Sequence, residues 1–185
     1  GHGDTNTDSH LELPVVDKDA GDLAECELVP FAKAVAEGVE IVMTAHVMFP
    51  AIDETVPATM SSSILRGWLR DRFGHTGIIV SDDMEMKAVR GRFPLEQQLD
   101  LACRATVDLF LMCRQLDLQV EAWETLIHLA EQDPTHDRPA KDSMRRLARL
   151  RDRFLLEATV PPDLSVVGSR AHKELAGVIN VRGRE

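Results

Sequence analysis

The sequence predicts an α/β fold in which helices cover a parallel sheet, and three observations support this. Three apolar runs have the length of buried strands: residues 41–47, 77–80 and 107–112. These runs are continuously apolar rather than alternating, which is typical of strands that are covered on both faces. Each run is followed by a segment with the apolar spacing of a helix, and this order is typical of parallel sheets. An open doubly wound sheet and a (β/α)8 barrel both satisfy it.

Helices are expected where apolar residues recur every three or four positions. Ser61 or Ser62 can cap a helix that Gly74 ends, and Gly38 is suited to end the helix before it. The other helices are expected over residues 23–37, 94–105, 120–131 and 142–156, with a short helix at 172–175.

The helix expected at residues 142–156 has an apolar and a basic side. The apolar side is expected to face inward and consists of Met144, Leu147, Leu150 and Phe154. The basic side is formed by Arg145, Arg146, Arg149, Arg151 and Arg153. A binding stripe is one interpretation of these arginines. Their alternation with acidic residues favours a solvated helix face.

The number of strand–helix units limits the possible folds. A (β/α)8 barrel needs about 250 residues and eight units, whereas three clear units are visible here. The chain is therefore expected to be the C-terminal part of something larger. No glycine-rich phosphate loop follows any of the apolar runs, which disfavours a dinucleotide-binding fold.

Composition and charge exclude several classes of partner. Apolar residues make up 44% of the 185 residues, and the net charge is −10. Nucleic acids and anionic membranes attract basic surfaces, so neither is expected as a partner. No apolar run approaches the roughly 20 residues of a membrane span. The sequence indicates no oligomeric state.

The three cysteines show no metal-site spacing. Cys103 and Cys113 lie among apolar residues, so buried free thiols in a reducing compartment are expected. The histidines likewise repeat at no ligand spacing. We therefore expect neither a metal ion nor another cofactor.

The first ten residues form a polar loop without an aliphatic side chain. Asp8 and His10 lie two positions apart, so in an extended loop their side chains leave from the same side. The carboxylate could then bond one imidazole nitrogen and leave the other free for proton transfer. A plain surface loop at the start of the chain is the alternative.

Polar residues also follow two of the predicted strands. In a parallel α/β fold, ligands bind at the carboxyl ends of strands. Asp82 and Asp83 follow one strand, and alternation sends them to opposite sides, so that Asp83 is expected to serve as a cap or structural acceptor. His46 follows another strand and is either a pocket-lining residue or a satisfied core histidine.

Four segments together resemble the bacterial β-N-acetylglucosaminidases of glycoside hydrolase family 3. The first is the opening segment, Gly-His-Gly-Asp-Thr-Asn-Thr-Asp-Ser-His, and the second is Gly-Ile-Ile-Val-Ser-Asp-Asp-Met-Glu-Met at residues 77–86. The other two are residues 41–53, with Thr-Ala-His-Val at 44–47, and residues 57–61. The long loop motif is specific, whereas Ser-Asp-Asp alone would be weak. The resemblance runs from residue 1 to about residue 156.

The resemblance implies the C-terminal portion of a (β/α)8 barrel in residues 1–158, followed by a C-terminal extension in residues 159–185. It implies a retaining hydrolase that removes terminal β-linked N-acetylglucosamine. Asp82 matches the family's nucleophile, His10 its acid/base and Asp8 the carboxylate that orients this histidine. His46 and Met84 are expected to contact the substrate.

The family's best-known role implies a muropeptide substrate, recycled in the cytoplasm. The residues that grip the sugar lie upstream of the loop in this family and cannot be assigned here. The 185-residue chain alone is therefore expected to be inactive or nearly so. A β-glucosidase, a phosphorylase of the same family and a non-catalytic fragment are the alternatives.

Overall fold

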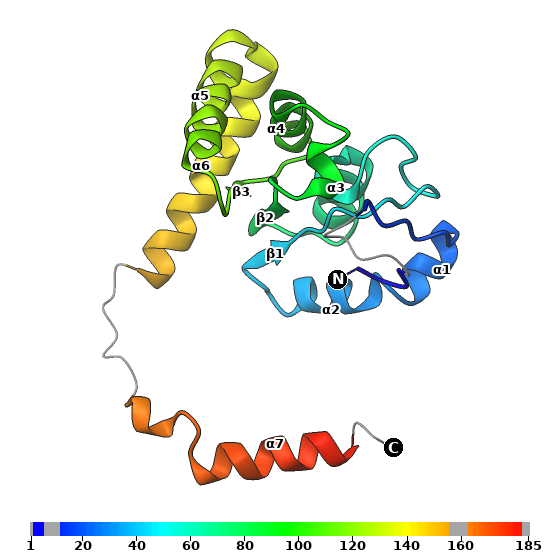
Figure 1. Cartoon of the computed structure of the whole chain (residues 1–185), viewed down its shortest axis with the longest axis vertical. Helices are drawn as coiled ribbons and strands as arrows, with labels where there is room; N and C mark the ends of the chain where they lie inside the picture. Colours follow the sequence, from blue (N-terminus) through cyan, green and yellow to red (C-terminus); the bar gives the residue numbers. More distant parts are fainter. Residues whose placement is uncertain (1, 6–11, 156–162, 183–185) are drawn as a thin grey trace. The chain divides into compact units, whose positions relative to one another are not determined.

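The computed structural model describes residues 2–5, 12–155 and 163–182 (Figure 1). The chain divides into two compact units, Gly1–Arg153 and Phe154–Glu185. In the second unit, a 3-10 turn at Leu164–Val166 precedes helix α7 at Arg170–Arg182, which is longer than the expected helix at 172–175. Among the helices in the described ranges, none has both the length and the apolar character needed to cross a bilayer.

The first unit is built around a three-stranded parallel sheet. The strands are β1 (Ile41–Met43), β2 (Ile78–Asp83) and β3 (Leu109–Leu111), in the order β1-β2-β3. Val42 pairs with Ile79 across the first pair of strands, and the second pair begins with Val80 opposite Leu109. The predicted α/β class and parallel sheet are confirmed. That these strands belong to a closed barrel, and that the domain ends at residue 158, stay predictions.

Helices precede, connect and follow the strands (Figure 1). Their bounds are α1 (Ala20–Glu25), α2 (Val29–Ala36), η2 (Ser63–Arg72), α3 (Lys87–Arg90), α4 (Leu95–Arg104), α5 (Leu116–Gln132) and α6 (Pro134–Phe154), with a 3-10 turn η1 at Ala58–Met60. The single helix expected at residues 23–37 is in fact two, because Pro30 lies in the first turn of α2 and has no N–H to continue a helix. Helix α6 begins at Pro134, eight residues before the expected start.

The main core lies between the sheet and the helices η2 and α4. Val42 and Ile79 on the strands pack with Leu65 and Leu69 of η2 and with Ala102 of α4. Side chains alternate across a strand, and the neighbours of Val42 point the other way. Those neighbours, Ile41 and Met43, are 45% and 50% exposed. One face of β1 is therefore covered by helices, and the other keeps apolar surface accessible.

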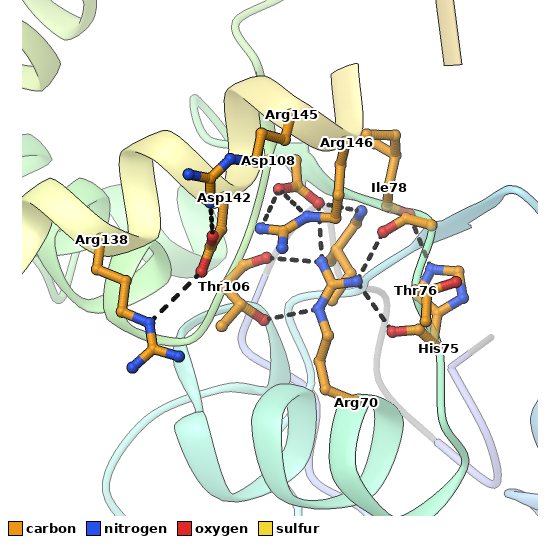
Figure 2. A network of polar contacts seen from close by, with 12 residues as sticks. Arg70, His75, Thr76, Ile78, Thr106, Asp108, Arg138, Asp142, Arg145 and Arg146 are labelled. Carbon is orange, nitrogen blue, oxygen red and sulfur yellow. Dashed lines mark hydrogen bonds and ion pairs between the residues drawn. The ribbon is translucent and has the colours of Figure 1, made fainter. Parts of the chain in front are cut away.

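A buried carboxylate fixes α6 to the amino ends of the strands (Figure 2). Asp108 accepts hydrogen bonds from Arg70 Nη2 and from the backbone N–H of Ile79, both at 2.8 Å. Its other oxygen accepts from Arg146 Nε at 2.9 Å. Arg149 adds a bond to the carbonyl of Thr76 at 3.1 Å. The expectation of a solvated arginine face is therefore wrong for Arg146, whose side chain is only 19% exposed.

The inward face predicted for α6 is also partly wrong. Met144 and Phe154 are 66% and 53% exposed, whereas Leu147 and Leu150 are half-buried. Apolar periodicity predicts the inward face only where apolar residues alone face the domain. Here an arginine takes part of that face, because a buried carboxylate without a counter-charge is costly.

Candidate active site

The carboxyl end of β2 holds the two adjacent aspartates. The strand continues through both residues, and its register with β3 shifts between Val80 and Asp83, so Asp82 stands on the strand at an irregularity of the ladder. Its Oδ1 atom accepts a hydrogen bond of 2.8 Å from the backbone N–H of Asp83. Within the described part of the chain, no hydrogen bond reaches its Oδ2 atom. Asp82 is half-buried, and one of its carboxylate oxygens is held by the backbone.

Asp83 has a structural role, as its position predicted. Its Oδ1 atom accepts from the backbone N–H groups of Glu85 at 3.1 Å and Cys113 at 3.3 Å. Its carbonyl oxygen lies 3.1 Å from Nε2 of His46. Asp83 therefore connects the ends of all three strands, because His46 follows β1 and Cys113 follows β3.

Glu85 ties the loop after β2 to the loop after β3. One carboxylate oxygen accepts from the backbone N–H groups of Arg114 at 3.0 Å and Gln115 at 3.1 Å. The Arg114 N–H is the largest cause of the lowered pKa of Glu85, which is only 9% exposed. No sequence motif predicts this role of Glu85. The sequence signal for a buried carboxylate is the position of Glu85 between Met84 and Met86, both of which are buried in the structure.

His46 is fully buried beside these carboxylates. Its Nδ1 atom has no hydrogen-bond partner among the described residues. Burial lowers the pKa of His46, while the carbonyl of Asp83 and the charges of Asp82 and Asp83 act in the opposite direction. Two expectations were left open for His46, a pocket-lining residue and a core histidine. Its zero exposure agrees with a core position, whereas its Nδ1 atom, unpartnered within the described ranges, departs from a satisfied core histidine.

Met84 is also fully buried, and its N–H donates to the carbonyl of Leu111 at 2.9 Å. The expected contact of His46 and Met84 with a substrate stays a prediction, because neither side chain has accessible surface in this structure. Both residues follow strands of the sheet, His46 after β1 and Met84 after β2, which contains Asp82. The structure shows no atom of either one exposed to a ligand.

The two expected residues of the opening loop, Asp8 and His10, lie outside the described residues. The described start of that segment is close to the site, since the charge of His2 is among the influences that lower the pKa of His46. On the other side of the loop, Val15 forms a parallel β-bridge with Met48, which lies shortly after β1. The described residues on both sides of Asp8 and His10 therefore come near the residues that follow β1.

The three cysteines are free thiols. Cys113 is exposed at the end of β3, so the expectation that it is buried is wrong: the apolar run ends at Met112 and the loop begins there. Cys103 is half-buried on α4, and burial raises its pKa to about 12. These positions make Cys103 a packing residue and place Cys113 at the edge of the candidate site.

A group of ligand-type side chains lies away from the site, formed by Asp100, Asp133 and His136. Arg104 already bonds both carboxylates, at 2.8 Å to Asp100 and 2.7 Å to Asp133. His136 Nε2 lies 2.7 Å from Asp100. The ion pairs and hydrogen bonds link α4 to the start of α6. The expectation of no metal or cofactor stays a prediction.

The arrangement at β2 suits a carboxylate that acts as a nucleophile or base. A strand holds Asp82 rigidly, a backbone N–H fixes one oxygen, and the neighbouring loops are tied by Asp83 and Glu85. Covalent catalysis by a carboxylate requires such a fixed oxygen close to the reacting carbon.

Comparison with known proteins identifies the family. The sequence profile described as Glycosyl hydrolase family 3 N terminal domain matches residues 1–150. A protein of Alkalilimnicola ehrlichii named Beta-hexosaminidase is 37% identical over 158 residues, which cover 81% of this chain and 44% of that protein. The chain spans less than half the length of the curated relatives it matches.

Solved structures agree in fold. A glycoside hydrolase family 3 β-N-acetylglucosaminidase from Paenibacillus sp. str. FPU-7 has a TM-score of 0.80 and 36% identity, covering 88% of this chain and 32% of that chain. Beta-glucoside phosphorylase BglX, at 24% identity and a TM-score of 0.78 over 94% of this chain and 34% of that chain, shares the fold. Because the profile match extends over most of its length, the chain belongs to glycoside hydrolase family 3.

Proposed function

We propose that the protein is a retaining glycosidase that removes terminal β-linked N-acetylglucosamine, with Asp82 as its nucleophile. The observation that carries this proposal is the geometry of Asp82 at the end of β2. Its Oδ1 atom is held by the N–H of Asp83, and we assign the attack to Oδ2. The choice of sugar rests on the relative named Beta-hexosaminidase and on the β-N-acetylglucosaminidase of similar structure.

The proposed reaction has two steps. In the first, Oδ2 of Asp82 bonds to the anomeric carbon, the bond from that carbon to the leaving oxygen breaks, and His10 donates a proton to that oxygen. In the second, His10 removes a proton from water as the water oxygen attacks the anomeric carbon and frees Asp82. Asp8 bonds the imidazole, holds its tautomer and favours its protonated form.

The natural substrate proposed is a glycoside or muropeptide that contains N-acetylglucosamine, and the proposed location is the cytoplasm. Both follow from the resemblance of residues 1–10 and 77–86 to the family's cell-wall-recycling members. Hydrolysis of muropeptides compared with chitin fragments tests the substrate, and fractionation of cells tests the location. Activity restricted to chitin fragments would contradict the muropeptide.

The nucleophile is tested in the full-length protein with an aryl β-N-acetylglucosaminide. Asp82→Asn should lower kcat by at least about 1,000-fold, because the amide cannot form the covalent intermediate. Asp117→Asn, which changes an exposed carboxylate in the first turn of α5, is the matched control and should leave kcat unchanged. Full activity of the Asp82 variant would rule out its role.

The acid/base role of His10 has a separate test. His10→Ala should slow substrates with poor leaving groups far more than activated aryl glycosides, because only poor leaving groups need protonation. Equal losses on both substrates would count against His10 as the acid. Asp8→Asn should show the same leaving-group dependence in a weaker form.

A phosphorylase is the second candidate, favoured by the histidine acid/base. A neutral imidazole places no second negative charge against an anionic acceptor such as phosphate. A β-glucosidase keeps the fold and changes the sugar. Comparing glucoside with N-acetylglucosaminide, each with and without phosphate, separates these activities. A glycosyl phosphate product would identify the phosphorylase.

The chain on its own is proposed to be inactive or nearly so. Turnover of an aryl β-N-acetylglucosaminide by these 185 residues, abolished by Asp82→Ala, would contradict this. A non-catalytic fragment that awaits a partner is the remaining alternative. A stable monomer with a protected core in hydrogen exchange would argue against it.

A further inference from the structure

His46 combines complete burial with a single hydrogen bond. Its Nε2 atom lies 3.1 Å from the carbonyl oxygen of Asp83, and its Nδ1 atom has no partner among the described residues. A satisfied core histidine would have both nitrogens bonded, and an apolar side chain of similar size would avoid the unpartnered acceptor. The bond to Asp83 is therefore the feature that an imidazole supplies at this position.

The protonation of the ring follows from its partner. A carbonyl oxygen only accepts, so Nε2 must carry the proton and donate it. Burial lowers the pKa of His46, which keeps the ring neutral near pH 7 and leaves Nδ1 without a proton. His46 therefore acts as a fixed donor.

Asp83 is held at three places. Its carbonyl accepts from His46, and its Oδ1 atom accepts from the N–H groups of Glu85 and Cys113. Its own N–H donates to Oδ1 of Asp82. A shift of the Asp83 backbone would therefore turn the carboxylate of Asp82.

We propose that His46 is a positioning residue for Asp82: its Nε2–H holds the carbonyl of Asp83, and the N–H of Asp83 sets the direction of the nucleophilic carboxylate. This inference rests on the proposed function, since the contact between His46 and Asp83 is taken to orient Asp82 as the nucleophile. In this role His46 acts through Asp83, and its zero exposure is compatible with that.

Two amide variants of His46 separate the effect of its hydrogen bond to Asp83 from the effect of side-chain size. The amide nitrogen of glutamine can reach the position of imidazole Nε2, whereas asparagine reaches only the position of Nδ1. His46→Gln can therefore keep the donor to Asp83, and His46→Asn cannot. Both introduce a buried amide, so each controls for the polarity of the other.

The experiment measures kcat and KM of the full-length protein on an aryl β-N-acetylglucosaminide, with thermal unfolding as a check on folding. His46→Asn should lower kcat by about 100-fold with KM within about threefold, as expected for a misplaced reacting group. His46→Gln should keep kcat within about fivefold of the wild type. Equal losses in both variants, or no loss in either, would overturn the proposal.

A second measurement needs no variant. In this chain labelled with ¹⁵N at histidine, the His46 ring should carry its proton on Nε2 and none on Nδ1 at pH 7. A proton on Nδ1 would overturn the proposal even if the variants fail to fold. Absence of turnover by the wild-type full-length protein, with the proton of this chain on Nε2, would instead overturn the proposed function and leave the contact itself intact.

Discussion

Two neighbouring arginines of α6 should contribute very differently to stability. Arg146 bonds Asp108 at 2.7 Å, with the arginine side chain 19% exposed and the carboxylate 0% exposed. Arg145 bonds Asp142 at the same distance, but these side chains are 75% and 37% exposed. Replacing each arginine by methionine keeps the aliphatic stem and removes the charge. The comparison therefore isolates the burial of the ion pair.

The expected magnitudes follow from that burial. Removing one partner of a buried ion pair costs about 3–5 kcal/mol. Asp108 keeps Arg70 and the N–H of Ile79 after Arg146→Met, so we expect a loss of roughly 2 kcal/mol, about half of that range. Exposed pairs contribute at most about 1 kcal/mol, so Arg145→Met should cost roughly 0.5 kcal/mol or less.

Thermal unfolding of this chain, followed by circular dichroism, measures Tm for both variants. In a domain of this size, 1 kcal/mol shifts Tm by roughly 2–4 °C, so Arg146→Met should lower Tm by about 4–8 °C and Arg145→Met by no more than about 2 °C. Equal destabilisation by the two substitutions would refute the structural role given to Asp108. A fully stable Arg146→Met variant would do the same.

Three further outcomes can be measured on the same chain. In urea unfolding, Gly77→Ala should destabilise the chain by about 1–3 kcal/mol, because the added Cβ would collide with a backbone oxygen. Gly67→Ala should instead stabilise helix η2 by roughly 0.5–1 kcal/mol, because no atom lies nearer than 3.9 Å to the added Cβ. Cys103, whose pKa burial raises to about 12, should stay unlabelled by iodoacetamide at pH 8 until the chain is unfolded; labelling in the native state would contradict its burial. The hydroxyl of Thr135 is the largest cause of a pKa of about 2 at Asp133, against an ordinary 3.8. A carboxylate with a lowered pKa stabilises the fold at pH values above its ordinary pKa. The Tm difference between wild type and Asp133→Asn should therefore be present at pH 6 and disappear as pH falls from 4 to 2. A Tm difference independent of pH would show that the carboxylate charge is irrelevant.

The sequence predicted the sheet well because the cause is local. Continuous apolar runs need burial on both faces, and all three runs contain a strand of the parallel sheet. The strand at Ile41–Met43 is shorter than its run, whose later residues are apolar or buried although they lie outside the strand. Burial alone therefore does not show where a strand ends.

The arginine network was not predictable from periodicity. Asp108 lies inside an apolar run, which is a signal of a buried charge, but the sequence does not name the partner. Arg70 and Arg146 lie 38 positions away on opposite sides of it. Only the packing of η2 and α6 brings both guanidinium groups to one carboxylate.

In the candidate site too, some features could be predicted from the sequence and others could not. The place of Asp82 at a strand end followed from the apolar run before it, and Asp83 was correctly predicted as a structural acceptor. The bond from His46 to the backbone of Asp83 spans 37 positions and involves a carbonyl, which every residue has and no sequence pattern marks. The clamp made by Glu85 on the loop after β3 is hidden for the same reason, since its partners are backbone N–H groups.

Covalent trapping of the nucleophile tests the central claim most directly. The full-length protein is incubated with a fluorinated N-acetylglucosaminyl fluoride, whose intermediate is hydrolysed slowly, and its peptides are then analysed by mass spectrometry. A retaining mechanism predicts one added sugar on the peptide that contains Asp82, at its carboxylate. A sugar attached to any other residue, or hydrolysis with inversion and no attached sugar, would contradict it.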